Sequence, residues 1–110
     1  MGQLRVVVYI DAAGQSTFSK WFEALNFEAA AKVTTALYRM RQGNFSNVEG
    51  VGSGVFEYRI DFGPGYRIYF GKDGEMLVVL LGGSSKKRQQ LAIQAARHAW
   101  TEYKRRKPRG

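Results

Sequence analysis

The sequence predicts a single α+β domain in which helices pack against a small antiparallel sheet. Three observations lead to this class. Apolar residues recur with the 3.6-residue period of a helix in residues 18–41 and 91–103, and with the two-residue period of a strand in residues 56–62. The chain of 110 residues suffices for one hydrophobic core, so we expect one domain that spans residues 1–110.

The first part of the chain predicts one strand followed by a helical hairpin. The β-branched and aromatic run from Val6 to Ile10 is typical of a strand. Ser16 is a suitable N-cap for a first helix, whose apolar face carries four residues at helical spacing: Phe18, Trp21, Phe22 and Leu25. Asn26 interrupts this pattern, and a second helix then runs from Phe27 to its stop at Gly43.

A β-hairpin is predicted after the glycine-rich loop that follows, in which residues 48–51 form at most a short strand. Alternation places one set of side chains on the apolar face of the first hairpin strand, namely Phe56, Tyr58, Ile60 and Phe62. The register that keeps apolar residues together sets Ile60 opposite Ile68. On the other face it sets Asp61 opposite Arg67 and Arg59 opposite Tyr69, which makes a contiguous polar patch.

The last part of the chain predicts a central strand and a helix. Asp73-Gly74 is a two-residue hairpin signal, and the run from Met76 to Leu81 has no alternation, as in a strand buried on both faces. Gly82-Gly83 end this strand, and Ser84 or Ser85 caps a helix that extends to about Lys104. We expect the helices to cover one face of the sheet, and residues 105–110 to form a flexible basic tail.

Composition limits the possible partners. Lys and Arg number 17 against 9 acidic residues, which gives a net charge of +8 and favours a polyanionic partner. The absence of cysteine excludes disulfides and thiolate zinc sites, and no metal or cofactor is expected. Because no apolar stretch approaches the roughly 20 residues of a membrane span, a cytoplasmic protein with no membrane partner is expected.

Two basic features are candidates for phosphate binding. The last helix opens with SSKKRQQ, where Lys86, Lys87 and Arg88 occupy a helix start that normally prefers acidic residues. Such a terminus, with its free N–H groups, suits a phosphate. Arg59 and Arg67 share the open sheet face with Tyr69, where guanidinium groups suit phosphate oxygens and the ring suits a base. Alternatively, the cations are only solvated and Asp61 pairs with Arg67.

At this point the segment NVEGVGSGVFEYRIDFGPGYRIYFGKDGEMLVVLLGGSSKKRQQ resembles the addiction-module killer proteins, a HigB/RelE-like subgroup of the RelE/ParE toxin superfamily. The resemblance covers residues 44–90 closely and the helices more loosely. It implies a RelE-like fold: an N-terminal strand, a helical hairpin, a three-stranded antiparallel meander that completes a small twisted sheet, and a C-terminal helix. It also implies the toxin component of a type II toxin–antitoxin module, a ribosome-dependent mRNA endoribonuclease that blocks translation.

The resemblance assigns roles to individual residues. Arg59, Arg67 and Lys86 would be catalytic, stabilising and positioning the phosphate during metal-independent attack by the RNA 2′-hydroxyl. Tyr69, Lys87 and Arg88 would bind substrate. Glu57 and Asp61 are the candidate general bases, although a carboxylate paired with arginine is a weak one. Gln89, Gln90 and Ile93 stand where some relatives of this kind carry an acid–base tyrosine or histidine.

Other functions remain open at this stage. The ParE branch implies an inhibitor that binds DNA gyrase without catalysis, and a non-catalytic or degenerate protein would only bind RNA or an antitoxin. The partners implied are a cognate antitoxin, expected to be a helix-turn-helix DNA-binding protein, together with the ribosome and mRNA or, alternatively, gyrase.

Overall fold

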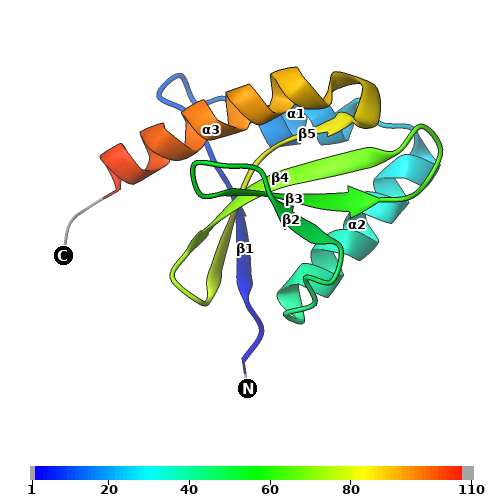
Figure 1. The fold of residues 1–110 in the computed structure, drawn as a ribbon, viewed down its shortest axis with the longest axis horizontal. Coiled ribbons are helices and arrows are strands. Elements are labelled where there is room, and N and C mark those ends of the chain that lie inside the picture. The colour runs from blue at the N-terminus through cyan, green and yellow to red at the C-terminus, as the bar shows by residue number, and fades with distance from the viewer. Residues whose placement is uncertain (1, 108–110) are drawn as a thin grey trace.

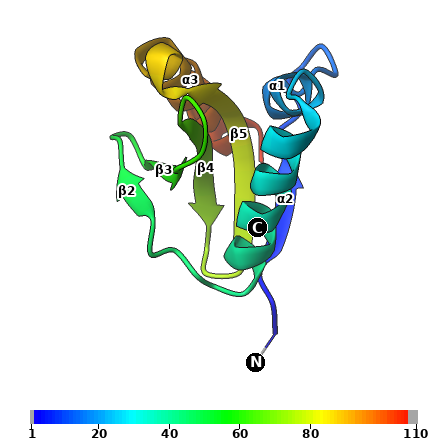
Figure 2. The ribbon, with the colours of Figure 1, turned by 90° about the vertical axis from the view of Figure 1, so that its right-hand side faces the viewer.

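In the computed structural model, which describes residues 2–107, a five-stranded sheet lies between two layers of helices (Figures 1 and 2). The strand order is β1-β5-β4-β3-β2, in which β1 runs parallel to β5 and the other neighbours are antiparallel. The strands are β1 Arg5–Val8, β2 Val48–Gly50, β3 Val55–Ile60, β4 Tyr66–Asp73 and β5 Leu77–Ser85. The helices are α1 Thr17–Glu23, α2 Phe27–Arg41 and α3 Gln89–Arg106, with the short 3₁₀ helix η1 Lys86–Arg88 before α3. The predicted α+β class and element order are confirmed.

The helices cover both faces of the sheet, whereas the sequence predicted one covered face. Helices α1 and α2 pack on the face that carries Tyr58, Ile68 and Phe70. Helix α3 packs on the opposite face, where Ile93, Ala96 and Trp100 form a second core with a set of strand residues, Val55, Tyr69, Val79 and Leu81. Figure 2 shows this sandwich in profile, with α3 on one side and α1 and α2 on the other. The unbroken apolar run of β5 reflects these two cores.

Both N-terminal helices are capped by side chains. The Ser16 hydroxyl accepts a hydrogen bond from the Ser19 N–H at 3.1 Å, as predicted. Asn26, which the sequence showed only as an interruption, caps α2 by accepting from the Ala29 N–H at 2.9 Å. Each cap satisfies an N–H group that the first helical turn leaves without a partner.

The predicted register of the β3–β4 hairpin is wrong by two residues. Ile60 lies opposite Tyr66, and Arg59 lies opposite Arg67, so the loop spans residues 61–65. Gly63 and Gly65 both adopt positive φ angles, of 55° and 82°, and the Gly65 N–H donates to the Phe62 carbonyl. This local turn keeps Phe62 from pairing with Tyr66. Because the error is an even number of residues, every side chain stays on its predicted face.

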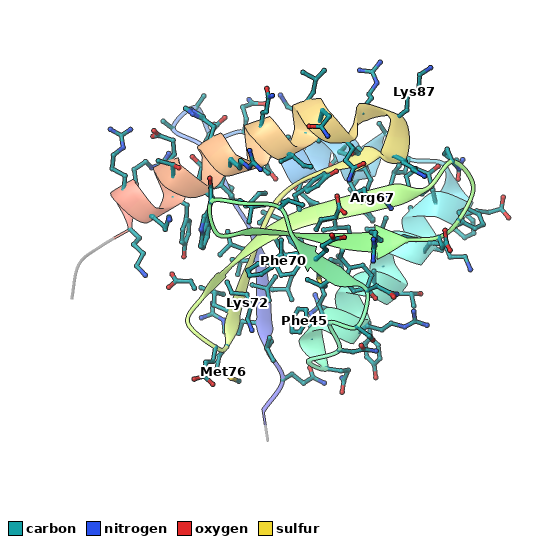
Figure 3. All side chains as sticks on the ribbon, viewed as in Figure 1. Phe45, Arg67, Phe70, Lys72, Met76 and Lys87 are labelled. Atoms are coloured by element: carbon teal, nitrogen blue, oxygen red, sulfur yellow. The ribbon has the colours of Figure 1, made fainter. Side chains whose placement is uncertain are left out.

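Strand β5 continues through Gly82-Gly83 to Ser85, although the glycines were expected to end it. A methyl group on Gly83 would overlap the Trp21 indole of α1, so glycine is required there for helix packing. The turn between β4 and β5 is also longer than predicted, because Asp73 pairs with Leu77 and leaves a three-residue loop, 74–76. Nearby, Phe45 stacks on Phe70 and the Lys72 ammonium lies over the Phe45 ring (Figure 3).

Helix α3 is longer than predicted, and part of the predicted tail is ordered. Arg105 and Arg106 belong to the helix. Lys107 forms an ion pair with Asp73 at 2.7 Å, and the Tyr103 hydroxyl donates to the same carboxylate at 2.7 Å. The expectation of a flexible tail is therefore wrong for residues 105–107, while residues 108–110 lie outside the described part. Within residues 2–107, none of the helices is long and apolar enough to span a membrane.

The Asp73 contacts predict a pH-dependent contribution to stability. Hydrogen bonds from Lys107 and then Tyr103 lower the pKa of Asp73, while burial followed by the bond to Asp73 raises the pKa of Tyr103 to about 12. A lowered carboxyl pKa stabilises the fold above the ordinary value of about 4, and this stabilisation is lost as the pH falls through the lowered pKa. We expect Asp73→Asn to be less stable than wild type at pH 7, and chemical denaturation to show the two converging in acid. A constant difference down to pH 2 would contradict this.

Candidate functional site

The arginines Arg59 and Arg67 lie directly opposite each other on β3 and β4, on the part of the sheet face beyond the start of α3. Directly opposed like charges repel, so the pair needs compensation. Each arginine is compensated by a glutamate that lies diagonally across from it on the neighbouring strand. Arg59 Nη1 lies 3.1 Å from Glu49 Oε1 on β2, and Arg67 Nε lies 3.7 Å from Glu57 Oε1 on β3. Glu49 and Glu57 are themselves directly opposed. Four charges on three strands thus neutralise one another in two diagonal pairs.

The two ion pairs differ in burial. The Arg59 side chain is 49% exposed and its partner Glu49 is more exposed still, so this pair contributes little to stability and is easily replaced by another anion. Arg67 is only 12% exposed and Glu57 only 3%. Gln89, at the start of α3, donates from Nε2 to Glu57 Oε1 at 2.7 Å. The buried carboxylate therefore places a negative charge beside Arg67, and the Gln89 hydrogen bond fixes the position of that carboxylate.

A cleft of about 400 Å³ opens above the arginines and is lined by Asn47, Arg59, Asp61 and Arg67. Arg67 Nε is buried without a hydrogen-bond partner among the described residues. The terminal nitrogens of Arg67 make no hydrogen bond with the described part of the protein and so remain free for a ligand. Asp61 forms no ion pair within residues 2–107, and the predicted Asp61–Arg67 pair is replaced by Glu57–Arg67.

The predicted role of Tyr69 in base stacking is wrong, because its ring is fully buried in the core beneath α3. Its hydroxyl lies 3.0 Å from the Ser84 hydroxyl, which is also buried. Burial raises the pKa of Tyr69, and the nearby Glu57 raises it further, while the Ser84 contact and Arg67 oppose the change. The Tyr69 phenol therefore stays neutral, and its side chain packs in the core.

The basic cluster Lys86, Lys87 and Arg88 forms η1, outside the cleft. Neither Ser84 nor Ser85 caps this turn with its side chain, so the predicted serine-capped phosphate site does not form. The Lys86 N–H donates to the Gly65 carbonyl at 2.9 Å, which places Lys86 beside the hairpin loop that precedes Arg67. Lys87 points away from the sheet in Figure 3, on the far side of η1 from Arg67. All three side chains are exposed.

Arg88 belongs to a different depression, a pocket of about 370 Å³ between α1 and the start of α3. Its walls are largely apolar, since Trp21, Tyr66 and Leu91 line it, and Leu91 is 70% exposed. No acidic residue lines this pocket. An exposed apolar pocket with one cation in its lining is suited to a partner that carries both acidic and apolar groups.

Sequence reasoning missed three residues of the site. Glu49 and Asn47 lie in the glycine-rich stretch, whose pairing with β3 no local pattern revealed. Gln89 was noted only for not being an acid–base residue, whereas the structure gives it a contact with Glu57. No cluster of three or more histidine, aspartate or glutamate side chains suited to a metal ion occurs in the described part of the chain.

Comparison with known proteins identifies one family relationship. The chain is 40% identical over 82 residues to a protein of Haemophilus influenzae named only as an uncharacterized protein. The alignment covers 74% of this chain and 83% of that protein. No family model matches the chain.

Proposed function

This chain belongs to one family with the Haemophilus influenzae protein, and we propose for it the function that its cleft supports best, metal-independent cleavage of mRNA by a RelE/ParE-like toxin acting on the ribosome. The observation that carries the proposal is the pair of opposed arginines at one cleft. One of them, Arg67, lies beside a buried carboxylate and lines the cleft, and its terminal nitrogens form no hydrogen bond with the described residues. Preorganised guanidinium donors stabilise charge that develops on a phosphate.

The chemistry requires few protein groups. The 2′-oxygen of one nucleotide attacks the adjacent phosphorus, the bond from phosphorus to the 5′-oxygen breaks, and a 2′,3′-cyclic phosphate and a 5′-hydroxyl result. Arg67 stabilises the additional negative charge on the phosphate, and Arg59 exchanges its exposed partner Glu49 for the RNA backbone. Lys86, beside the hairpin loop, adds positive charge at the margin.

Asp61 is the better of the two candidate bases. It lines the cleft and forms no ion pair among the described residues, so its carboxylate is available to accept the 2′-hydroxyl proton. Glu57 is buried, and a single oxygen of it faces both Arg67 and Gln89, so Glu57 acts on the substrate only through Arg67. The leaving 5′-oxygen takes its proton from water or from the ribosome.

The proposal is tested by pulse expression of the wild-type protein in a bacterial host, with mapping of mRNA 5′ ends. New 5′ ends within translated frames, absent in an Arg67→Gln strain that accumulates the same amount of protein, are expected. Growth arrest with intact mRNA and with DNA breaks would contradict the nuclease and favour gyrase inhibition. Normal growth at full expression would contradict both toxin functions and favour a protein that only binds RNA or an antitoxin.

The cognate partner in this proposal is an antitoxin with an acidic, amphipathic segment. The apolar pocket beside Arg88 supports this chemistry, as do the cations of η1, which form no ion pair within residues 2–107. We expect Leu91→Glu to weaken binding of the neighbouring gene product by about tenfold or more, because it adds a negative charge to the apolar wall. Phe27→Glu is the matched control, since Phe27 is 88% exposed at the start of α2 and away from the pocket. Calorimetric titration that finds equal losses for both variants would contradict this docking site.

A further inference from the structure

The arginine cleft does not end at Arg59. A second depression, of about 260 Å³, lies between α2 and the end of β3, and it shares Asn47, Arg59 and Asp61 with the first. The two depressions therefore adjoin at the end of β3, and together they are called the groove. The strand edge is open here, because β2 pairs only as far as Tyr58 and a single Arg59 N–H bond to the Asn47 carbonyl extends the contact.

Helix α2 contributes a row of polar side chains to this second depression. Lys32, Thr35 and Arg39 line it, and their spacing of three and four residues places them along one face of the helix. Seven residues of α-helix separate the two cations by about 10 Å along the axis. The same depression is lined by Ile60, Asp61 and Phe62 at the end of β3. Helix α2 packs on this side of the sheet (Figure 2).

Both cations of the row are available for a ligand. Lys32 and Arg39 are exposed, and neither forms an ion pair within the described residues. The Lys32 ammonium lies 5.2 Å from the centre of the Phe62 ring, which holds it over the groove. The lining of the two depressions includes four cations, Lys32, Arg39, Arg59 and Arg67, and the carboxylate of Asp61. Glu49 and Glu57 pair with Arg59 and Arg67, so the two α2 cations are the ones without an acidic partner among the described residues.

The lining favours a phosphodiester backbone over an acidic peptide. An amphipathic peptide needs exposed apolar area, and the walls here are mainly polar, with Phe62 the partly exposed aromatic residue. The pocket beside Leu91 offers that apolar area instead. Spaced cations along a polar groove, with guanidinium forks, are the features that hold the backbone of a single strand.

We propose that the groove between α2 and the end of β3 is a second phosphate-binding subsite, which holds the RNA strand on one side of the phosphate at Arg67. The inference rests on the proposed function in taking RNA as the ligand. The strand runs from Arg67 past Arg59 to Arg39 and Lys32. Only a segment of several nucleotides spans this path. A longer RNA should therefore bind more tightly than a short one, because only the longer RNA reaches Lys32 and Arg39.

The test measures binding without cleavage. The probes are a fluorescein-labelled 2′-O-methyl trinucleotide and dodecanucleotide of uridine, which lack the attacking hydroxyl, and anisotropy reports affinity at several salt concentrations. The variant is Lys32→Gln/Arg39→Gln. The matched control is Lys20→Gln/Arg41→Gln, which removes the same charge from exposed positions that line neither depression.

We expect the Lys32→Gln/Arg39→Gln protein to bind the dodecanucleotide about tenfold or more weakly than the control protein does. The salt slope should fall by about 1.4, which corresponds to two lost contacts with a single strand. The trinucleotide should bind both variants equally, and Lys32→Arg/Arg39→Lys should restore the binding of the longer probe. Circular dichroism checks that α2 is retained in each protein.

Equal losses in the two glutamine variants would overturn the subsite, as would a dodecanucleotide that wild type binds no better than the trinucleotide. Polyglutamate that binds with the same dependence on Lys32 and Arg39 would overturn it in favour of an acidic protein. If the expected binding is found while cellular mRNA stays intact, the subsite is supported and the proposed nuclease fails.

Discussion

Arg67→Gln will lower the rate of mRNA cleavage by roughly 100- to 1,000-fold, the usual effect of removing one preorganised donor to a developing oxyanion. The geometry gives the reason. Arg67 lines the cleft beside a carboxylate that is only 3% exposed, and its terminal nitrogens form no hydrogen bond with the described residues. A flexible lysine would supply charge without the planar pair of donors, so Arg67→Lys should recover only part of the rate. Single-turnover cleavage on purified ribosomes measures the loss.

A second pair of variants separates this loss from unfolding. Removing Arg67 leaves Glu57 buried with only its Gln89 bond, and breaking a buried ion pair costs roughly 3 to 5 kcal/mol. In Glu57→Gln/Arg67→Gln the buried charge is absent, so stability should recover while cleavage stays lost. Arg105→Gln, which removes an exposed ion pair on α3, should cleave as wild type does. Recovered cleavage in the double variant would show that Arg67 acts on the fold alone.

Gly83→Ala will destabilise the protein by about 1 to 3 kcal/mol, because the added methyl group overlaps the Trp21 ring and forces α1 away from β5. The damage extends toward the site, since Gly83 lies on β5 opposite Ile68, the residue after Arg67. Denaturant unfolding monitored by tryptophan fluorescence measures the change.

Gly82→Ala is the matched control for this packing effect. It adds the same methyl group to the same strand one residue earlier, where the nearest atom, Thr17 Cγ2, would be 3.6 Å away in ordinary contact. We expect Gly82→Ala to leave stability within about 0.5 kcal/mol of wild type or to raise it slightly. Equal destabilisation by both substitutions would indicate a backbone requirement for glycine and contradict the contact with Trp21.

Side-chain periodicity predicted the faces of the sheet more reliably than its pairing. Phe56, Tyr58 and Ile60 lie on the α1–α2 face as expected, because alternation depends only on the strand itself. The register depended on the loop, where two glycines with positive φ angles make a five-residue turn that the Gly-Pro-Gly sequence does not specify. Hence the opposed arginines, the central feature of the site, could not be predicted from the sequence.

The sequence contains a signal for the second helical layer, although helices were expected on one face of the sheet only. The unbroken apolar run of β5 predicts burial on both faces, which requires a helix on each. Placing α3 on the second face buries Tyr69 under Ile93 and Trp100, so its role as an open stacking platform fails. The predictions that relied on charge agree with the structure, because Arg59, Asp61 and Arg67 line one cleft. The prediction for Tyr69 relied on an exposed ring and does not.

Carboxylate partners were the hardest part of the site to predict. Glu57 and Asp61 are equivalent in the sequence, since they lie four residues apart and alternation predicts the same strand face for both. Their difference arises from α3, which brings Gln89 to Glu57, whereas Asp61 lines the cleft. Contacts between residues 32 apart in the chain depend on how the helix docks, and no local pattern encodes them.

The central claim is that the Arg59–Arg67 cleft acts on an RNA phosphate. The most direct measurement is a reconstituted translation reaction with purified wild-type protein, in which the termini of the mRNA fragments are analysed. The account predicts fragments with 2′,3′-cyclic phosphate and 5′-hydroxyl ends, their formation at least about 100-fold slower with Arg67→Gln, and no requirement for added metal beyond that of the ribosome. Intact mRNA in the presence of folded wild-type protein, or cleavage that persists undiminished in Arg67→Gln, would contradict it.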